Sequence, residues 1–290
     1  MGRGDKTEPR RDFETLIGLE ALAENIHRQD WVVVDCRFDL ADTDKGEHAY
    51  RQSHIPGARY AHLDRDLSGP VTAVTGRHPL PDSERFARWL GAQGIHTRSQ
   101  VVAYDDLGGS MAVRLWWLMR WLGHRRVAVL DGGFQAWRDA GLMVTADVPA
   151  PEPAVFEGMA DDSLVVHTNA LMEPKAGRVL IDVRTAERFR GEVEPIDPVA
   201  GRIPGAVNVP WPDNLGPDGR FLPPATLRDR YAQATDPEAE ERVVMCGSGV
   251  TACFGILALE IAGVSGARLY AGSWSEWIRD PGRPVMTGEG

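Results

Sequence analysis

Residues 243–252 read Val-Val-Met-Cys-Gly-Ser-Gly-Val-Thr-Ala, and the rest of the chain is best understood from this stretch outward. An apolar run ends abruptly at Cys246, two glycines follow within three residues, and 251–263 has the apolar composition of a buried helix. A strand that turns so tightly into a helix leaves the cysteine sulfur at the helix N-terminus. Unpaired backbone N–H groups and the helix dipole favour a negative charge there.

The anion best placed to use this environment is the thiolate of Cys246, which is the nucleophilic form of cysteine. Gly247 and Gly249 allow the backbone to curl so that successive amides point inward and form a nest for negative charge. A buried structural cysteine before an ordinary strand–helix turn is the plainer interpretation. The flanking glycines and the position at a helix start favour the nucleophile.

Three motifs occur twice in the same order, at an offset of 140 to 148 residues. They are a buried strand ending in Asp-x-Arg, the tetrapeptide Ile-Pro-Gly-Ala, and a glycine-aromatic segment ending in tryptophan. The matching segments are 31–37 with 178–184, 55–58 with 203–206, and 131–137 with 271–277. Solenoid repeats have periods of roughly 20–50 residues. The longer offset therefore indicates duplication of a whole domain.

Two domains also agree with a length of 290 residues. We expect a flexible N-terminal tail over 1–14, a first domain over 15–145 and a second domain over 163–290. The segment between them, 146–162, carries three prolines and little apolar periodicity, so we expect a linker that crosses the surface.

Each copy alternates short β-branched strands with helical segments, which predicts an α/β fold with a mostly parallel central sheet flanked by helices. In the first copy we expect strands at 101–104 and 127–130, with helices at 83–90 (capped by Asp82 or Ser83) and 111–122. In the second copy the matching strands are 242–245 and 267–270, and the helices are 225–234 and 251–262.

Composition restricts the environment and the partners. The chain is 43% hydrophobic and 26% charged with a net charge of −10, which argues against nonspecific nucleic-acid binding. No apolar run reaches the roughly 18 residues of a transmembrane helix, so no membrane partner is expected. The N-terminus lacks the apolar segment of a signal peptide. Three widely spaced cysteines fit neither a disulfide framework nor a zinc site, and we expect a cytoplasmic protein.

The loop Cys-Gly-Ser-Gly-Val-Thr-Ala at 246–252 resembles the active-site loop of the rhodanese family of sulfurtransferases, in particular that of the 3-mercaptopyruvate sulfurtransferases. The resemblance to tandem rhodanese-domain proteins extends from about Leu16 to Val285. It implies two rhodanese-like domains and a ping-pong reaction in which Cys246 attacks the outer sulfur of a donor and becomes a persulfide. Cyanide, a small thiol or a protein thiol such as thioredoxin then accepts the sulfur. No metal or organic cofactor is needed.

The two copies differ at the nucleophile. Asp105 and Asp106 stand where the first domain would carry its cysteine, and a carboxylate cannot accept a sulfane sulfur. We therefore expect the first domain to be catalytically silent and to form a wall of the cleft. Cys36, at a strand end, and Cys253, inside the helix, are expected to be structural.

The residues after the nucleophile bear on the donor. In thiosulfate-using members of the family, cationic side chains follow the cysteine, whereas Gly247 and Ser248 are neutral here, as in the mercaptopyruvate enzymes. The resemblance places the donor against the loop residues Gly247, Gly249, Val250 and Thr251. Mercaptopyruvate is the predicted donor, and thiosulfate is the alternative.

The resemblance also implies arginines that bind the donor's carboxylate and carbonyl. Arg188 matches the first of them, and its planar guanidinium suits a carboxylate. A solvated surface cation is the alternative interpretation. The family's second arginine is expected nine residues later, where this chain has Asp197. Arg202, which aligns with His54 of the first copy, is a candidate to replace it.

The mercaptopyruvate branch further implies a Ser/His/Asp relay beside the nucleophile. Ser248 matches the loop serine, His78 matches a first-domain histidine before a Leu-Pro element, and Asp64 matches an aspartate shortly after Ile-Pro-Gly-Ala. Such a trio could move a proton to the pyruvate enolate as the C–S bond breaks. A hydrogen-bonded loop framework is the alternative.

Two other classes of protein were weighed. A phosphatase with this fold needs a Cys-x5-Arg loop, but the sixth residue after Cys246 is Ala252, so the arginine that would bind phosphate is missing. The other class is a non-catalytic rhodanese-like binding module. One intact and one degenerate loop is the pattern of an enzyme.

Overall fold

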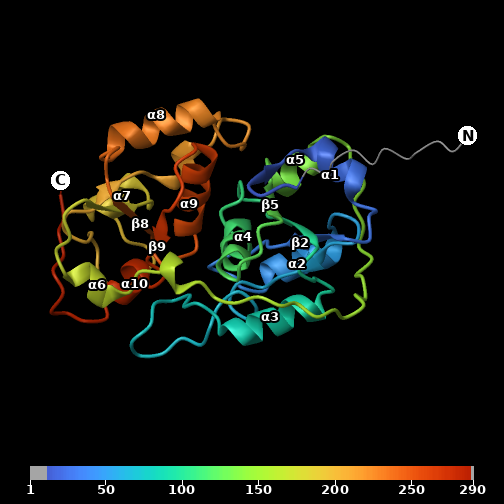
Figure 1. Ribbon diagram of the computed structural model, residues 1–290, viewed down its shortest axis with the longest axis horizontal. Coiled ribbons are helices and arrows are strands. Elements are labelled where there is room, and N and C mark those ends of the chain that lie inside the picture. Colours follow the sequence, from blue (N-terminus) through green and yellow to red (C-terminus); the bar gives the residue numbers. More distant parts are fainter. Residues whose placement is uncertain (1–11, 289–290) are drawn as a thin grey trace, which may run out of the picture.

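A computed structural model describes residues 12–288, which form two parallel β-sheets with helices packed on them (Figure 1). The first sheet has the order β1-β5-β4-β2-β3, and every pair of neighbouring strands in it is parallel. Its strands are β1 Leu16–Ile17, β2 Trp31–Asp35, β3 Arg59–Tyr60, β4 Gln100–Tyr104 and β5 Val127–Leu130. The central strands are apolar and buried, as expected for a parallel sheet covered on both faces.

The helices of the first domain lie close to the predicted positions. They are α1 Leu19–Asn25, α2 Lys45–Gln52, α3 Ser83–Ala92, α4 Ala112–Trp121 and α5 Gly133–Asp139. Helix α3 begins at Ser83 because the carboxylate of Asp82 accepts the backbone N–H of Arg85, which would otherwise be unpaired.

The second sheet has the order β7-β6-β8-β9 and is also parallel. Its strands are β6 Arg178–Asp182, β7 Val207–Asn208, β8 Glu241–Met245 and β9 Arg268–Leu269. The helical elements are η1 Asp162–Leu164, α6 Thr168–Met172, α7 Ala186–Arg190, η2 Trp211–Asn214, α8 Pro224–Ala234, α9 Ala252–Ile261 and α10 Ser273–Trp277. The predicted α/β fold with parallel central sheets is confirmed.

The repeated motifs meet in space within each domain. In the first domain Arg37 forms a bidentate ion pair with Asp35, and its guanidinium lies 4.3 Å from the ring centre of Phe134. In the second, Arg184 pairs in the same way with the aspartate of its own motif and lies 4.8 Å from the ring of Trp274. The Asp-x-Arg and glycine-aromatic motifs therefore recur together because each pair joins the end of a strand to the following layer of the domain.

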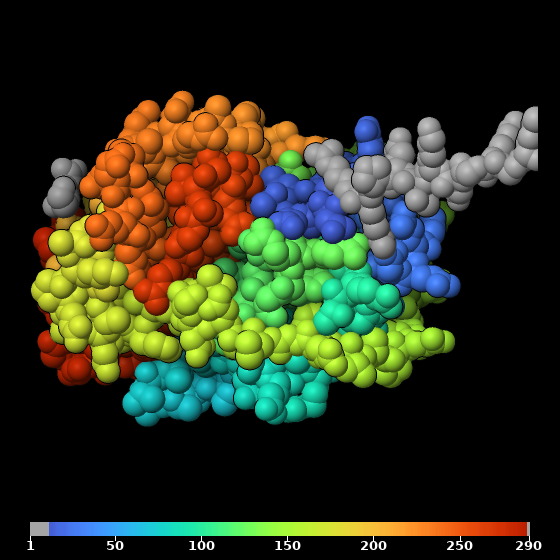
Figure 2. Space-filling view, in the orientation of Figure 1, coloured from blue at the N-terminus to red at the C-terminus, as the bar shows by residue number. Residues whose placement is uncertain are grey.

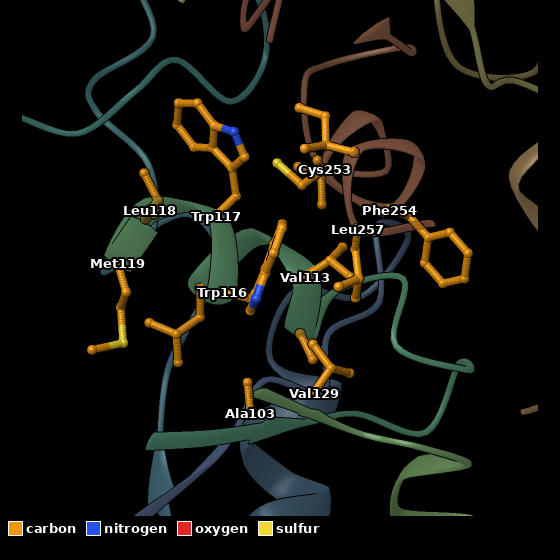
Figure 3. Packing of buried hydrophobic residues seen from close by; sticks show 14 of the residues in the cluster. Ala103, Val113, Trp116, Trp117, Leu118, Met119, Val129, Cys253, Phe254 and Leu257 are labelled. Carbon is orange, nitrogen blue, oxygen red and sulfur yellow. The ribbon is translucent and has the colours of Figure 1, made fainter. Parts of the chain in front are cut away.

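Helices α4 and α9 join the two domains through a continuous apolar core. Buried side chains of both helices belong to one cluster, and Figure 3 shows Val113 and Trp117 of α4 beside Cys253 and Leu257 of α9. Arg120 on α4 adds an ion pair to Glu260 on α9, at 3.1 Å. Because this interface is apolar and well packed, it fixes the position of any site that lies between the domains.

The segment 146–162 crosses the surface of the first domain, as predicted (Figure 2). It is nevertheless anchored: the Ala154 N–H donates to the carbonyl of Gly91 at 2.8 Å, and Phe156 is buried beside His124. The domain boundaries proposed from the sequence remain predictions.

The flexible tail predicted over 1–14 needs a correction at its C-terminal end. Residues 1–11 lie outside the described part of the chain. Phe13 exchanges backbone hydrogen bonds with the side-chain amide of Gln100, and the carboxylate of Glu14 pairs with Arg125 at 2.6 Å. Residues 12–14 are therefore bound to the first domain. Within 12–288, none of the helices has the length and apolar character needed to cross a membrane.

Candidate active site

Cys246 immediately follows β8, a central strand, and precedes α9. Its side chain is buried, and its sulfur accepts the backbone N–H of Gly249 at 3.1 Å. Gly249 adopts the left-handed conformation with φ of +81°, and a Cβ there would collide with the carbonyl of Ala271. Glycine is thus required for the turn that brings this amide to the sulfur.

A second residue, which the sequence did not reveal, holds the backbone of the nucleophile. The N–H of Cys246 donates to Oγ of Ser273 at 3.1 Å, and that hydroxyl donates to the carbonyl of Tyr270. Ser273 has φ of +53°, the only positive value for a non-glycine residue within 12–288, and it aligns with Gly133 of the first copy. Such strain persists where the surrounding contacts require it, and here the hydroxyl supplies the contact.

In the first domain Asp105 occupies the position after β4 that corresponds to Cys246. Its buried carboxylate accepts four backbone N–H groups at 2.7–2.8 Å, namely those of Leu107, Gly109, Met111 and Ala112. Burial raises the pKa of Asp105 even though these four donors oppose the shift. The predicted nest of inward-pointing amides therefore exists in this copy, and a carboxylate of the protein fills it.

A cavity of about 540 Å³ lies above Cys246, and both domains line it. Its walls are largely apolar, with Leu40, Leu63, Leu107 and Met111 on one side and Ile196, Trp211 and Leu215 on the other. Four of the five predicted donor-binding residues line it, namely Arg188, Gly247, Val250 and Thr251. Gly249 does not line it but lies beneath the sulfur.

The structure brings the three predicted relay residues together across the domain interface. Nδ1 of His78 lies 2.7 Å from Oγ of Ser248, and Nε2 lies 3.2 Å from Oδ1 of Asp64. Ser248 and His78 line the main cavity, whereas Asp64 faces an adjacent cavity of about 330 Å³ and its side chain is 44% exposed. The chain of groups thus runs from beside the sulfur to solvent.

The two titratable members of this trio have shifted pKa values. Burial lowers the pKa of His78, against the opposing effect of the Asp64 carboxylate. The hydrogen bond from His78 lowers the pKa of Asp64. The imidazole is therefore neutral near pH 7, with one nitrogen free to accept a proton from the serine hydroxyl.

Arg188, on α7, lies in the cavity wall as predicted. Its guanidinium donates to Glu194 at 2.7 Å and to Asp197 at 3.2 Å. Asp197, at the position where the family's second arginine was expected, is a counterion of Arg188.

The suggestion that Arg202 replaces the missing arginine is wrong. Arg202 is buried away from the cavity, with its guanidinium 4.7 Å from the ring centre of Phe189 and a hydrogen bond to the carbonyl of Gly288. Its counterpart His54 is also buried, stacked on Tyr50. This position of the repeat is therefore a core position in both domains.

Arg77 is a cavity residue that the sequence analysis passed over, although it precedes His78 directly. It comes from the first domain, lines the cavity and forms an ion pair with Asp197. Only the folded chain shows that it reaches the second domain's loop.

The other two cysteines are buried, in agreement with their structural interpretation. Sγ of Cys253, in the first turn of α9, donates to the carbonyl of Gly249 at 3.3 Å, and burial raises the pKa of this thiol to about 12. Burial likewise raises the pKa of Cys36. Both side chains are therefore neutral thiols at physiological pH.

The fold and the site define a class: a duplicated α/β protein whose second copy presents a cysteine, held by loop amides, to a cavity between the copies. A family model, the Rhodanese-like domain, matches residues 19–140 and 167–280. The chain belongs to this family, and the family predicted from the active-site loop is confirmed.

Three relatives illustrate its neighbours. A protein named "Probable 3-mercaptopyruvate sulfurtransferase" from Pseudomonas aeruginosa is 51% identical over 279 residues, covering 94% of this chain and 98% of the relative. The thiosulfate sulfurtransferase of Rattus norvegicus is 33% identical over 280 residues, covering 92% and 93%. The crystal structure of SseA from Escherichia coli, a 3-mercaptopyruvate sulfotransferase, superposes with a TM-score of 0.80 at 29% identity, covering 90% and 98%.

Proposed function

We propose that this protein is a sulfurtransferase that moves the sulfur of 3-mercaptopyruvate onto Cys246 and then to a thiophilic acceptor. One observation carries the proposal: the buried cysteine shares a single cavity with a Ser–His–Asp relay and with Arg188. The relatives named as sulfurtransferases, with either donor, support the same class of enzyme.

In the first half-reaction the Cys246 thiolate attacks the donor's sulfur. An S–S bond forms, the donor's C–S bond breaks, and the electron pair of that bond stays on carbon as the enolate of pyruvate. The Gly249 N–H, 3.1 Å from the sulfur, stabilises the thiolate before the attack and the persulfide anion after it. The same donor thus serves both charged states.

The relay keeps the proton count balanced. If Cys246 begins as a thiol, its proton passes through the hydroxyl of Ser248 to the neutral imidazole of His78, whose positive charge the Asp64 carboxylate stabilises. The same proton returns through Ser248 to the enolate carbon when the C–S bond breaks. The products are a cysteine persulfide and pyruvate.

Arg188 provides the contact for the donor's carboxylate. Two of its guanidinium nitrogens, Nε and Nη2, are held by Glu194, and the third, Nη1, faces Gly247 at the base of the cavity. A charge-assisted hydrogen bond of this kind contributes about 1.5–3 kcal/mol.

In the second half-reaction a nucleophilic acceptor attacks the outer sulfur of the persulfide and regenerates the Cys246 thiolate. Cyanide or a small thiol fits the cavity of about 540 Å³. A protein thiol such as thioredoxin is a further candidate, provided that its cysteine reaches the sulfur through the cavity mouth. Asp105 leaves the first domain without a nucleophile and with the role of a cavity wall.

Thiosulfate is the second candidate donor, because a relative that is 33% identical carries that name. The loop of this chain has neutral residues at Gly247 and Ser248, and Ser248 is engaged by His78, which favours mercaptopyruvate. The test is a side-by-side measurement of kcat/KM for the two donors with cyanide as acceptor. A higher value for thiosulfate would contradict the proposed donor and leave the sulfurtransferase assignment standing.

A further inference from the structure

We propose that the carboxylate of the donor is bound by two arginines, Arg77 from the first domain and Arg188 from the second, and that Asp197 orients both. The inference rests on the proposed function, since the anion is taken to be the carboxylate of a 2-oxo acid. It assigns the second arginine of the site to a different domain and a different part of the sequence from those the family resemblance implied.

The two guanidinium groups converge on Gly247, the residue next to the nucleophile. A Cβ placed on Gly247 would lie 3.1 Å from Nη2 of Arg77, and 3.4 and 3.5 Å from Nη2 and Nη1 of Arg188. A side chain at this position would enter the space between the two cations. The absence of a side chain at Gly247 therefore keeps a small volume open, bordered by two arginines and adjacent to the reactive sulfur.

Each arginine directs an unoccupied nitrogen toward that volume. Arg77 pairs with Asp197 through Nη1, and Arg188 donates to its two carboxylates through Nε and Nη2. Nη2 of Arg77 and Nη1 of Arg188 have no hydrogen-bond partner within residues 12–288. A planar carboxylate with two oxygens matches two such donors.

Arg77 is held in position by the backbone around it. Its N–H donates to Oγ of Ser275 at 3.0 Å, and Nε of Arg279 donates to the carbonyl of Thr75 at 3.1 Å. The preceding Gly76 packs so closely on the carbonyl of Gly272 that a Cβ would lie 2.6 Å from it. Figure 1 shows the loop between β3 and α3, which carries these residues, extending beneath the second domain next to α10.

The charges explain why an aspartate occupies position 197. Its side chain is 3% exposed and contacts both arginines, one through each oxygen. With Arg77 already delivered by the first domain, an arginine at this position would bring three cations together over Gly247, with Glu194 as their nearest acid. Asp197 instead keeps the pair neutralised and aligned, and leaves the outward N–H groups for the substrate.

The test uses the full-length protein and measures binding separately from chemistry. Pyruvate, the unreactive carboxylate product, is titrated into the Arg77→Met and Arg188→Met variants and the wild type by calorimetry. The kcat and KM for 3-mercaptopyruvate are measured in parallel. We expect each substitution to weaken pyruvate binding about 10- to 100-fold and to raise KM more than it lowers kcat.

Arg120→Met is the matched control, because Arg120 also forms an ion pair between the domains but does not line the cavity. It should leave the pyruvate Kd unchanged. A merely structural role for Arg77 is tested by the neutral double variant Arg77→Met/Asp197→Met, which removes the bridge without leaving an unpaired charge. If that variant binds pyruvate like the wild type, the inference is overturned.

Exchange of the charges gives the converse test. Asp197→Arg alone should disturb the site by crowding three cations, whereas Arg77→Asp/Asp197→Arg restores one arginine and one acid at the same place. We expect the double variant to recover most of the pyruvate affinity that Arg77→Asp alone loses. Failure to recover it would count against two exchangeable arginine positions over Gly247.

The outcomes separate this inference from the proposed function. Sulfur transfer from mercaptopyruvate together with an unchanged pyruvate Kd in Arg77→Met overturns the two-arginine site alone, as does a wild type that binds no pyruvate. An Arg77-dependent pyruvate affinity in a protein that does not use mercaptopyruvate supports the carboxylate site and overturns the proposed donor.

Discussion

Ser248→Ala removes the relay member nearest the reacting sulfur without changing the shape of the loop. Oγ of Ser248 lies 2.7 Å from Nδ1 of His78, so the substitution breaks the only contact that links the imidazole to the loop. A positioned proton relay contributes about 10²–10⁴-fold to rate. Because water can enter the vacated space, we expect the lower end of this range, about a 100-fold fall in kcat with 3-mercaptopyruvate, or about 2.7 kcal/mol.

The same variant should lose much less activity with thiosulfate. Sulfite leaves as a stable anion and needs no proton, whereas the pyruvate enolate must be protonated at carbon. The assay is therefore a steady-state comparison of both donors with cyanide as acceptor, at a pH where His78 is neutral. The expected signature is a selective loss, not a general one.

Ser99→Ala is the control, since Ser99 is also buried and accepts the N–H of His96 in a turn that does not line the cavity. It should lower stability by about 1 kcal/mol and leave both donors equally active. Equal losses for the two donors in Ser248→Ala would refute the proton-relay argument and leave Ser248 with a structural role.

Three further predictions follow from the same geometry. Because burial lowers the pKa of His78 below its ordinary value of 6.5, against Asp64 and in concert with Arg114 and Arg77, kcat with mercaptopyruvate should hold steady as pH falls through 6.5 and decline only below it; a midpoint above 6.5 in the pH–rate profile would contradict this. Gly249→Ala should cost at least about 100-fold in kcat, because the displaced amide no longer reaches Sγ, whereas Gly57→Ala, equally left-handed at +75° but with open space around its Cβ, should keep full activity. Asp105→Ala leaves four buried N–H groups unpaired and should lower the free energy of unfolding by about 3–5 kcal/mol in denaturant titrations, against less than about 0.5 kcal/mol for the exposed neighbour in Asp106→Ala.

The catalytic loop could be predicted from sequence because its determinants are local. An apolar strand, a cysteine, two glycines and an apolar helix follow one another in 243–263, and the model places β8, the turn and α9 within a residue or two of the expected limits. The repeated motifs located the matching loop of the first domain in the same way, with Asp105 at the position of Cys246.

The members of the site that depend on contacts between domains were harder to find. His78 and Asp64 came from a family resemblance, since nothing in their own segment places them beside Ser248. Arg77 was missed because its role depends on how the loop between β3 and α3 docks on α10. Ser273 was missed because its unusual backbone conformation leaves no trace in the amino-acid type.

The error at Arg202 has a different cause. The repeat aligned it correctly with His54, but an alignment gives the position of a residue and not the direction of its side chain. Both side chains point into their own domain, where each lies against an aromatic ring. Aromatic residues shortly before each Ile-Pro-Gly-Ala motif were the available signal for a core position.

The central inference, that Cys246 carries the sulfur, is tested most directly by intact-protein mass spectrometry after 3-mercaptopyruvate is added without an acceptor. We expect the wild type, and the Cys36→Ser and Cys253→Ser variants, to gain the mass of one sulfur atom, to lose it when cyanide is added, and to release pyruvate in equal amount. The Cys246→Ser variant should gain none while remaining folded. A persulfide on Cys253 or Cys36, or sulfur transfer by the Cys246→Ser variant, would contradict the mechanism.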